Sequence, residues 1–363
     1  MRKIIYYILL ASVVMASACT AQAVGYRKFQ REFYNTFDTV VVVVAYARSQ
    51  QEFDALSDIV QSRMLRFHRL FDIYRNYEGV NNLKTVNDNA GIRPVKVDKD
   101  IIGLLGQSQL WYQETGGMVN VAMGCVLRIW HDYREAGELG EADAKLPPKE
   151  ALEEAARHTD IGNMIIDEAG STIYLADPEM RLDVGAIAKG YAVEAITDEL
   201  IALGYDSVLL SAGGNIRAIG SPRDGQRDKW RVGIAKPEMS FGIAVQPREL
   251  LDVAYVNDMS VVSSGGYERY YLVDGAAYHH LIDPITLFPA NYYKAVTVFT
   301  QDSEAADVLS TALFLIPPEE ALEFAKGLEG VEALWVMPDN SLMVTDGINE
   351  ILYDPGGGDK GGA

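Results

Sequence analysis

The chain has 363 residues, of which 48% are hydrophobic and 23% are charged, a balance typical of globular proteins. This length accommodates one large domain or two moderate ones, and it allows a core large enough to enclose a cofactor. The formal net charge of −19 repels nucleic-acid phosphates and argues against DNA or RNA as a partner, and an anionic substrate would need a bound cation or a few well-placed basic groups.

The first residues have the features of an export signal. Arg2 and Lys3 form a short positive region, and an apolar run follows over residues 4–16. This run is too short to cross a bilayer but has the length of the apolar part of a signal peptide. We therefore predict a signal peptide over residues 1–18.

Small residues directly before Cys19 favour lipoprotein processing, after which Cys19 would be the lipidated N-terminus. Ordinary cleavage at the small-residue site at 21–23 is the alternative. We expect a lipid-anchored segment over residues 19–34, which would hold the exported protein on the outer face of the cell membrane. A lipidated Cys19 leaves Cys125 without a disulfide partner, and apolar neighbours favour a small buried side chain there over a nucleophile.

The first half of the chain is predicted to contain one strand and several helices. The β-branched run at 40–44 predicts a buried strand. Apolar residues recur at helical spacing over 53–71, and the patterns at 101–112 and 149–158 also predict helices. Residues 81–91 are rich in Asn and Asp, so an irregular segment is expected there.

The second half mixes strands and helices without strict alternation, which favours an α+β fold with mixed sheets over a doubly wound one. A glycine-containing turn leads into a helix over 186–203, and another helix should begin with Asp302 or Ser303 as N-cap. The expected strands are 208–211, 216–219, 295–300 and a last pair around the turn at 338–341. Residues 267–273 and 278–282 should form a hairpin joined through Asp274-Gly275. We expect one globular domain over 35–350 and a disordered Gly-rich tail over 351–363.

Residues 182–191 place an acid, a glycine turn and a lysine around a helix start. Free backbone N–H groups at a helix N-terminus suit an anion. Lys189 could pair with phosphate, and Asp183 could accept a hydrogen bond from a ligand ring or hydroxyl. The alternative is a plain strand-to-helix turn with a surface lysine.

Asp307 and Thr311 are four residues apart on a predicted helix, so the carboxylate and the hydroxyl share one face. A hard cation such as Mg²⁺ takes oxygen ligands of this kind, completed by carbonyls, water and substrate phosphate. The alternative is a capping acid and a Thr bonded to its own helix.

Two adjacent histidines, His279 and His280, lie on a predicted strand. Side chains alternate along a strand, so the two rings should point to opposite faces and a metal shared by both is disfavoured. One imidazole could act as a general base near neutral pH, and the alternative is a structural histidine at a sheet edge.

Two glycine-containing turns complete the candidate set. Gly213 and Gly214 permit positive φ and let a ligand approach the backbone, or they form an ordinary hairpin turn. Residues 263–267 could bind phosphate or ring edges, or they could simply end a strand.

Taken together, these motifs resemble the ApbE family, the FAD:protein FMN transferases. The resemblance runs from about residue 35 to residue 345, nearly the whole of the mature chain, and the order of six motifs makes it specific. The markers are residues 37–39, 182–191, 213–215, 263–267, 280–284 and 306–313. The family often has Met-Gly-Thr where this chain has Phe37-Asp38-Thr39, and Asn120 stands where an Asp is frequent.

The resemblance implies roles for particular residues in binding FAD. Asp183 and Lys189 would contact FAD. The flavin or adenine pocket would include Phe37, Tyr74, Met118, Val119 and Asn120.

It also implies a metal and a base. Asp307 and Thr311 would be side-chain ligands of Mg²⁺, with further contacts from Ser310 and from the backbone carbonyl of Ala186. His280 occupies the position of the catalytic histidine.

The implied reaction is the Mg²⁺-dependent transfer of FMN from FAD to a Ser or Thr hydroxyl of an exported flavoprotein. A phosphoester bond forms and AMP leaves. Two other readings stay open: an FAD pyrophosphatase that releases FMN and AMP, and a flavin-binding lipoprotein without catalysis.

Overall fold

The computed structural model describes residues 25–139, 144–238 and 249–353. The predicted signal peptide, Cys19 and residues 354–363 of the predicted tail lie outside these ranges. Among the described residues, no helix combines the length and the hydrophobicity needed to cross a bilayer.

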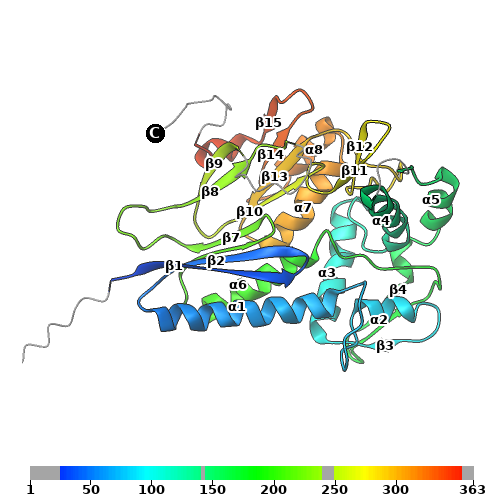
Figure 1. Cartoon of the computed structure of the whole chain (residues 1–363), viewed down its shortest axis with the longest axis horizontal. Helices are drawn as coiled ribbons and strands as arrows, with labels where there is room; N and C mark the ends of the chain where they lie inside the picture. Colours follow the sequence, from blue (N-terminus) through cyan, green and yellow to red (C-terminus); the bar gives the residue numbers. More distant parts are fainter. Residues whose placement is uncertain (1–24, 140–143, 239–248, 354–363) are drawn as a thin grey trace, which may run out of the picture.

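An eight-stranded sheet forms the centre of the molecule (Figure 1). Its order is β1-β2-β6-β7-β10-β13-β14-β15, and every neighbouring pair is antiparallel. The strands are β1 (Arg27–Thr36), β2 (Thr39–Ala47), β6 (Ser207–Ala212), β7 (Asn215–Gly220), β10 (Ser260–Gly265), β13 (Ala295–Thr300), β14 (Glu332–Val336) and β15 (Leu342–Val344).

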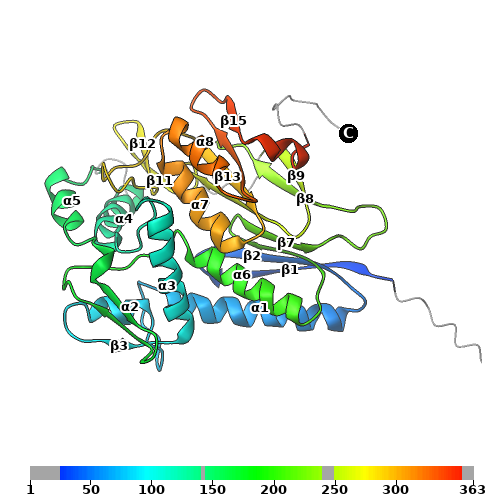
Figure 2. The ribbon, with the colours of Figure 1, turned by 180° about the vertical axis from the view of Figure 1, so that it is seen from behind.

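Helices cover one face of this sheet, as the view from behind shows (Figure 2). They are α1 (Gln50–Phe71), α6 (Ala188–Ala202), α7 (Ser303–Leu315) and α8 (Pro318–Lys326). The helix α1 buries Phe53, Val60 and Phe67 at helical spacing against strand residues such as Val41 and Val43. This packing removes the apolar stripe of α1 from water and fixes its C-terminal end beside the sheet.

The hairpin β8 (Trp230–Ala235) and β9 (Leu250–Val256) packs on the opposite face. Alternation along the strands divides the core: Val261 and Phe299 pack in the cluster that contains Trp230, whereas Val262 and Val298 pack with residues of α7. The sheet is therefore buried on both faces in its centre.

A group of smaller elements lies at one end of the sheet (Figure 1). It contains α2 (Leu83–Asp88), α3 (Lys99–Glu114), α4 (Gly124–Leu139), α5 (Lys149–Ala156), the sheet β3 (Val95–Lys96), β5 (Thr172–Leu175), β4 (Met164–Asp167), and the hairpin β11 (Tyr270–Val273) and β12 (Ala276–His279). Two short 3₁₀ turns, Ile161–Asn163 and Asp346–Glu350, complete the described elements.

Most of the predicted elements are confirmed. The strand at 40–44, the helices at 53–71, 101–112 and 149–158, and the helix after Asp302 are all present. Asp302 is the N-cap, and its side chain accepts a hydrogen bond from the Ala305 N–H at 2.8 Å. The hairpin turn at Asp274-Gly275 has the positive φ values that its sequence predicts.

Other predictions are wrong. Residues 81–91 contain the helix α2, because Asn82 acts as its N-cap and Leu83 and Val86 are buried. The second strand of the predicted hairpin ends at His279, so His280 lies beyond it. The helix α4 was not predicted; its last five residues fall in a polar stretch over 135–148.

The predicted domain boundaries also need correction at both ends. The strand β1 includes residues 27–34, so this part of the expected N-terminal segment belongs to the main sheet. Ile351 and Leu352, which fall within the expected tail, are buried, and Tyr353 N donates to Val253 O at 3.0 Å. The folded domain is therefore longer than predicted.

Candidate active site

A cavity of about 820 Å³ lies where the end of α1, the beginning of α6, one face of α7, the end of β10 and the segment before β11 meet. Of the predicted site residues, only Ser310 is not in its lining. Those that line it are Phe37, Tyr74, Met118, Val119, Asn120, Asp183, Ala186, Lys189, His280, Asp307 and Thr311. Residues separated by up to 274 positions in the chain thus share one site.

The helices α6 and α7 meet at one wall of this cavity. The Lys189 ammonium lies 3.2 Å and 3.4 Å from the two carboxylate oxygens of Asp307, and the Gly190 N–H donates to Asp307 Oδ2 at 2.8 Å. A Cβ at Gly190 would lie 2.5 Å from Ser303 O and 2.6 Å from Asp307 Cβ. Glycine is therefore needed here for the close approach of the two helices, which we call the α6–α7 contact.

Asp307 is 4% exposed, and the Lys189 ammonium lies against its carboxylate. Thr311 follows one turn later and lines the same cavity. Ser310 instead donates from its hydroxyl to the Asp307 backbone carbonyl at 2.9 Å and contacts Ser264 Oγ at 2.8 Å. The structure thus assembles Asp307 and Thr311 in the cavity and leaves Ser310 inside the protein.

The loop before α6 differs from its predicted role as a backbone anion site. The N–H groups of Ile187 and Ala188 both donate to Val184 O, at 3.0 Å and 2.9 Å, and the Gly190 N–H is taken by Asp307. The expectation of free N–H groups at this helix start is therefore wrong for these three residues. Positive charge for an anion comes instead from side chains.

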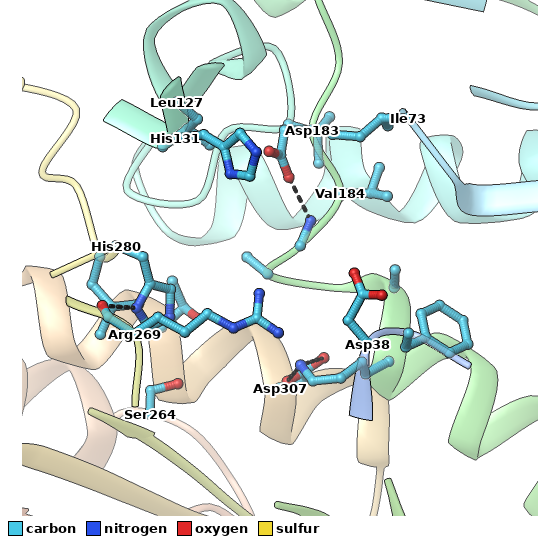
Figure 3. A pocket seen from close by; sticks show the side chains of 18 of the residues that line it. Asp38, Ile73, Leu127, His131, Asp183, Val184, Ser264, Arg269, His280 and Asp307 are labelled. Atoms are coloured by element: carbon cyan, nitrogen blue, oxygen red, sulfur yellow. Dashed lines mark hydrogen bonds and ion pairs between the residues drawn. The ribbon is translucent and has the colours of Figure 1, made fainter. Parts of the chain in front are cut away.

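Asp183 is fixed at the cavity wall through its own backbone and side chain. Its N–H donates to Val121 O at 2.8 Å, and its Oδ1 accepts from the Gly185 N–H at 2.8 Å. Burial raises the pKa of this carboxyl group, and the His131 ring lies beside it (Figure 3). An acid with a raised pKa can share a proton with a ligand nitrogen or hydroxyl.

The two histidines point apart, as predicted. His279 is buried, and its Nε2 lies 2.8 Å from Ala290 O outside the cavity lining. His280 lines the cavity, and its Nδ1 lies 3.2 Å from the backbone carbonyl of Arg269. A carbonyl can only accept, so Nδ1 carries the hydrogen and Nε2 keeps its lone pair.

Burial, with the Arg269 charge as the next cause, lowers the pKa of His280 to about 3. The imidazole is therefore neutral at physiological pH. A neutral ring with a fixed Nδ1–H is the form that can accept a proton at Nε2.

Arg269 and Asp38 also line the cavity, although the sequence motifs did not assign them a role. Figure 3 shows the Arg269 side chain extending from the side of His280 toward Asp307 and Asp38. Arg269 lies in the turn between β10 and β11, where no periodic pattern predicts a direction. Only its chain position, next to the 263–267 motif, could have indicated it.

The aromatic side of the cavity is built from two turns. Phe37 and Asp38 form the two-residue turn between β1 and β2, with φ values of 52° and 50°. Tyr74 follows the end of α1, and its ring centroid lies 5.3 Å from that of His131. We refer to Phe37 and Asp38 as the β1–β2 turn.

Asn120 lines the cavity, but its side-chain amide is engaged within the protein. Its Nδ2 donates to Thr159 O at 2.9 Å, and its Oδ1 accepts from the Ala122 N–H at 2.9 Å. Asn120 thus fixes the loop that presents Met118 and Val119.

Cys125 is half-buried, and its Sγ donates to Ala155 O at 3.1 Å. Burial raises the pKa of this thiol, which disfavours the thiolate, so the structure agrees with a packing role. Within the described ranges, no three His, Cys, Asp or Glu side chains converge on one point.

Comparisons with known proteins agree with the motifs. The ApbE family profile matches residues 37–335. A protein of Treponema pallidum named FAD:protein FMN transferase is 35% identical over 278 residues, which cover 73% of each chain. A protein of Klebsiella pneumoniae with the same name is 28% identical, over 76% of this chain and 84% of its own.

Solved structures share the fold. The ApbE protein of Thermotoga maritima superposes with a TM-score of 0.76 at 24% identity, covering 89% of this chain and 99% of that one. The flavinyl transferase ApbE of Pseudomonas stutzeri, in its apo form, gives 0.73 at 24% identity, covering 90% and 97%. The predicted α+β class and the resemblance drawn from the motifs are thereby confirmed. The chain belongs to the ApbE family of enzymes.

Proposed function

We propose that this enzyme transfers FMN from FAD to a Ser or Thr hydroxyl of an exported flavoprotein, in an Mg²⁺-dependent reaction that forms a phosphoester and releases AMP. The observation that carries the proposal is the gathering of His280, Arg269 and the Lys189–Asp307 pair around one cavity of about 820 Å³. Cofactor sites commonly have cavities of this size. The name shared by the relatives, FAD:protein FMN transferase, supports the same reaction.

The two sides of the cavity suit the two kinds of group in FAD. Phe37 and Tyr74 offer aromatic surface for a ring system. Lys189 and Arg269 offer the positive charge that a diphosphate requires in a protein whose net charge is −19. Asp183 could accept a hydrogen bond from a ring N–H or a ribityl hydroxyl.

The donor atoms also fit Mg²⁺ held jointly by the protein and FAD. Asp307 supplies a buried carboxylate, Thr311 a hydroxyl, and Ala186 a backbone carbonyl. Mg²⁺ prefers oxygen ligands and is commonly held by one or two carboxylates with substrate phosphates, so it does not require three converging acids. When bound, it would neutralise charge on the diphosphate and favour attack at phosphorus.

His280 is the residue proposed to move the proton. As the acceptor oxygen bonds to the FMN-side phosphorus, the hydroxyl proton passes to Nε2, while Nδ1–H stays bonded to Arg269 O. The bond from that phosphorus to the bridging oxygen breaks, and AMP leaves with the bridging oxygen. Arg269 and Lys189 would stabilise the charge that develops on the phosphate oxygens.

The test is a transfer assay with purified protein, FAD, Mg²⁺ and a candidate acceptor domain. The expected product is an acceptor heavier by one FMN, detected by mass spectrometry, with an equal amount of AMP. His280→Asn should lower the rate by about 10²–10⁴-fold. His279→Asn is the matched control, because that ring lies outside the cavity lining.

Two outcomes would replace the proposal. Free FMN and AMP with an unmodified acceptor would identify a pyrophosphatase. Unchanged FAD, bound but not cleaved in the presence of Mg²⁺, would identify a flavin carrier.

We also propose that the enzyme is exported and anchored through a lipid on Cys19, because a short apolar run and small residues precede that cysteine. Metabolic labelling with a fatty acid should mark the wild-type protein and not Cys19→Ala. A wild-type protein that takes no label, with its N-terminus near residue 24, would indicate ordinary signal cleavage.

A further inference from the structure

Three side chains at the C-terminal end of α1 form a chain of hydrogen bonds behind the aromatic side of the cavity. The Phe37 N–H donates to His68 Nδ1 at 3.2 Å, and His68 Nε2 lies 3.3 Å from the Tyr77 hydroxyl. The Tyr77 hydroxyl donates to Asp72 Oδ2 at 2.7 Å. We call His68, Tyr77 and Asp72 the α1-end relay.

The direction of each hydrogen bond in the relay follows from the donors available. The single hydroxyl hydrogen of Tyr77 goes to Asp72, so the Tyr77 oxygen accepts from His68 Nε2–H. His68 Nδ1 is then free to accept from the Phe37 N–H. Burial and the Asp72 carboxylate raise the pKa of Tyr77 to about 12, which keeps its hydroxyl protonated.

The relay connects the two turns of the aromatic side. At one end it holds the backbone of Phe37, whose φ of 52° is unfavourable for a residue with a side chain. At the other end, Asp72 Oδ1 accepts from the N–H groups of Tyr74 at 2.7 Å and Arg75 at 3.0 Å. Phe37 and Tyr74, which are 37 positions apart, are therefore held by one set of bonds.

Tyr77 itself does not line the cavity. It lies in a second hollow on the far side of the relay, where the Arg69 guanidinium is 5.8 Å from its ring centroid. An effect of Tyr77 on a ligand in the cavity must therefore pass through His68 and Asp72, which do line it.

We propose that the α1-end relay is a positioning device that sets Phe37 and Tyr74 together against the flavin, and that Tyr77 is the positioning residue linking its two ends. This inference rests on the proposed function, because it takes Phe37 and Tyr74 as the walls of the flavin site. It predicts that the two walls act as a unit in binding FAD. A relay that merely stabilises the fold would change the stability of the protein and leave FAD affinity alone.

The first test is Tyr77→Phe, which removes the hydroxyl and keeps the ring that packs against His68 and Arg69. We expect the Kd for FAD, measured by quenching of flavin fluorescence, to rise about fivefold. The kcat at saturating FAD should change less than twofold, because His280 and Asp307 are untouched. Tyr293→Phe is the matched control: it removes a buried hydroxyl bonded to Ile316 O at 3.0 Å, away from the cavity lining.

A double-mutant cycle tests the linkage of the walls. Phe37→Ala and Tyr74→Ala should be non-additive in their effects on the Kd for FAD in the wild-type background. In the Tyr77→Phe background the two effects should become additive. Additivity in both backgrounds, or a Kd for Tyr77→Phe equal to that of Tyr293→Phe, would overturn the proposal.

The hydrogen-bond directions can be tested without FAD. The imidazole ¹⁵N shifts of wild-type protein should report His68 as the Nε2–H form and His280 as the Nδ1–H form. An Nδ1–H form of His68 would contradict the relay even if Tyr77→Phe failed to fold. Because binding is read separately from transfer, an enzyme that binds FAD without transferring FMN would contradict the proposed function and still test the relay.

Discussion

The α6–α7 contact and the β1–β2 turn line the same cavity, yet they are held in place by different forces. At the contact, two regular helices approach closely because Gly190 has no side chain, and buried polar bonds join Asp307 to the neighbouring helix. At the turn, two residues with side chains adopt positive φ, and a long-range hydrogen bond to His68 holds the backbone. The α6–α7 contact depends on the absence of a side chain at Gly190, whereas the β1–β2 turn depends on a strained backbone.

The two regions should therefore tolerate different substitutions. Adding an atom at the α6–α7 contact should destabilise the protein, whereas removing a side chain in the β1–β2 turn should relieve strain and stabilise it. The two regions also differ in charge. The α6–α7 contact buries the Asp307 carboxylate beside the Lys189 ammonium, whereas the Asp38 carboxylate in the β1–β2 turn is exposed. Four changes test this comparison.

The largest effect is expected at Asp307. Asp307→Ala removes the buried carboxylate that pairs with Lys189 and is proposed to hold Mg²⁺, so FMN transfer should fall at least about a thousandfold. Transfer should be measured by mass spectrometry over a titration of Mg²⁺. Asp302→Ala is the control on the same helix, because it removes only an N-cap and should leave transfer nearly unchanged. Full activity of Asp307→Ala at limiting Mg²⁺ would remove this residue from the mechanism.

A smaller effect is expected for Gly190→Ala, which adds a Cβ where Ser303 O and Asp307 Cβ leave no room. Overpacking should lower the free energy of unfolding by about 2–3 kcal/mol, measured by urea denaturation. Gly106→Ala on α3 is the matched control, because no atom lies within 4 Å of its Cβ position, and it should be neutral or stabilising. Equal stability of the two variants would mean that the helices are not in close contact.

Glu304, on the same helix α7, should make the stability of the protein sensitive to pH. Burial raises the pKa of this carboxyl from 4.5 to about 7, while Trp111 Nε1 donates to it at 2.8 Å. Between pH 4.5 and about pH 7 the folded state holds the Glu304 proton more tightly than the unfolded state does. The free energy of unfolding therefore falls as the pH rises through this window. Glu304→Gln should therefore stabilise the protein by about 1–2 kcal/mol more at pH 8 than at pH 5, after allowance for solvent screening. The same difference in free energy of unfolding between Glu304→Gln and wild type at pH 5 and at pH 8 would contradict this prediction.

The smallest effect is expected for Asp38→Gly, which relieves the positive φ of the turn. We expect a gain of about 0.5–1 kcal/mol in the free energy of unfolding. Asp274→Gly, at a φ of 50° in the β11–β12 turn, should give a similar gain. A loss of stability for Asp38→Gly alone would show that its carboxylate has a binding partner that outweighs the strain.

The comparison also explains what the sequence could predict. Asp307 and Thr311 lie on one helix whose periodicity and N-cap are local, so the face that they share could be predicted from their spacing. The turn between β1 and β2 has no such signal, because its conformation depends on His68, 31 positions later. Arg269 could not be predicted either, because it lies in a turn, where no helical or strand periodicity indicates the direction of a side chain.

Two errors have clear physical causes. The Asn- and Asp-rich composition around Asn82 predicts an irregular segment, but Asn is also a preferred N-cap, and burial of Leu83 stabilises a helix there. Backbone N–H groups at the start of α6 were expected to bind an anion, but the preceding Val184 carbonyl accepts two of them. Burial of Leu83, a tertiary contact, decided the first case, and local bonds to the Val184 carbonyl within the turn decided the second.

The strand β1 has a practical consequence for handling the protein. Its ten residues run from Arg27 to the turn at the cavity, and at about 3.3 Å per residue they span about 30 Å. A bead, chip surface or affinity tag joined ahead of Arg27 would thus be attached at the end of β1 that lies about 30 Å from the cavity. Immobilisation from that side should keep the mouth of the cavity accessible to a large protein substrate.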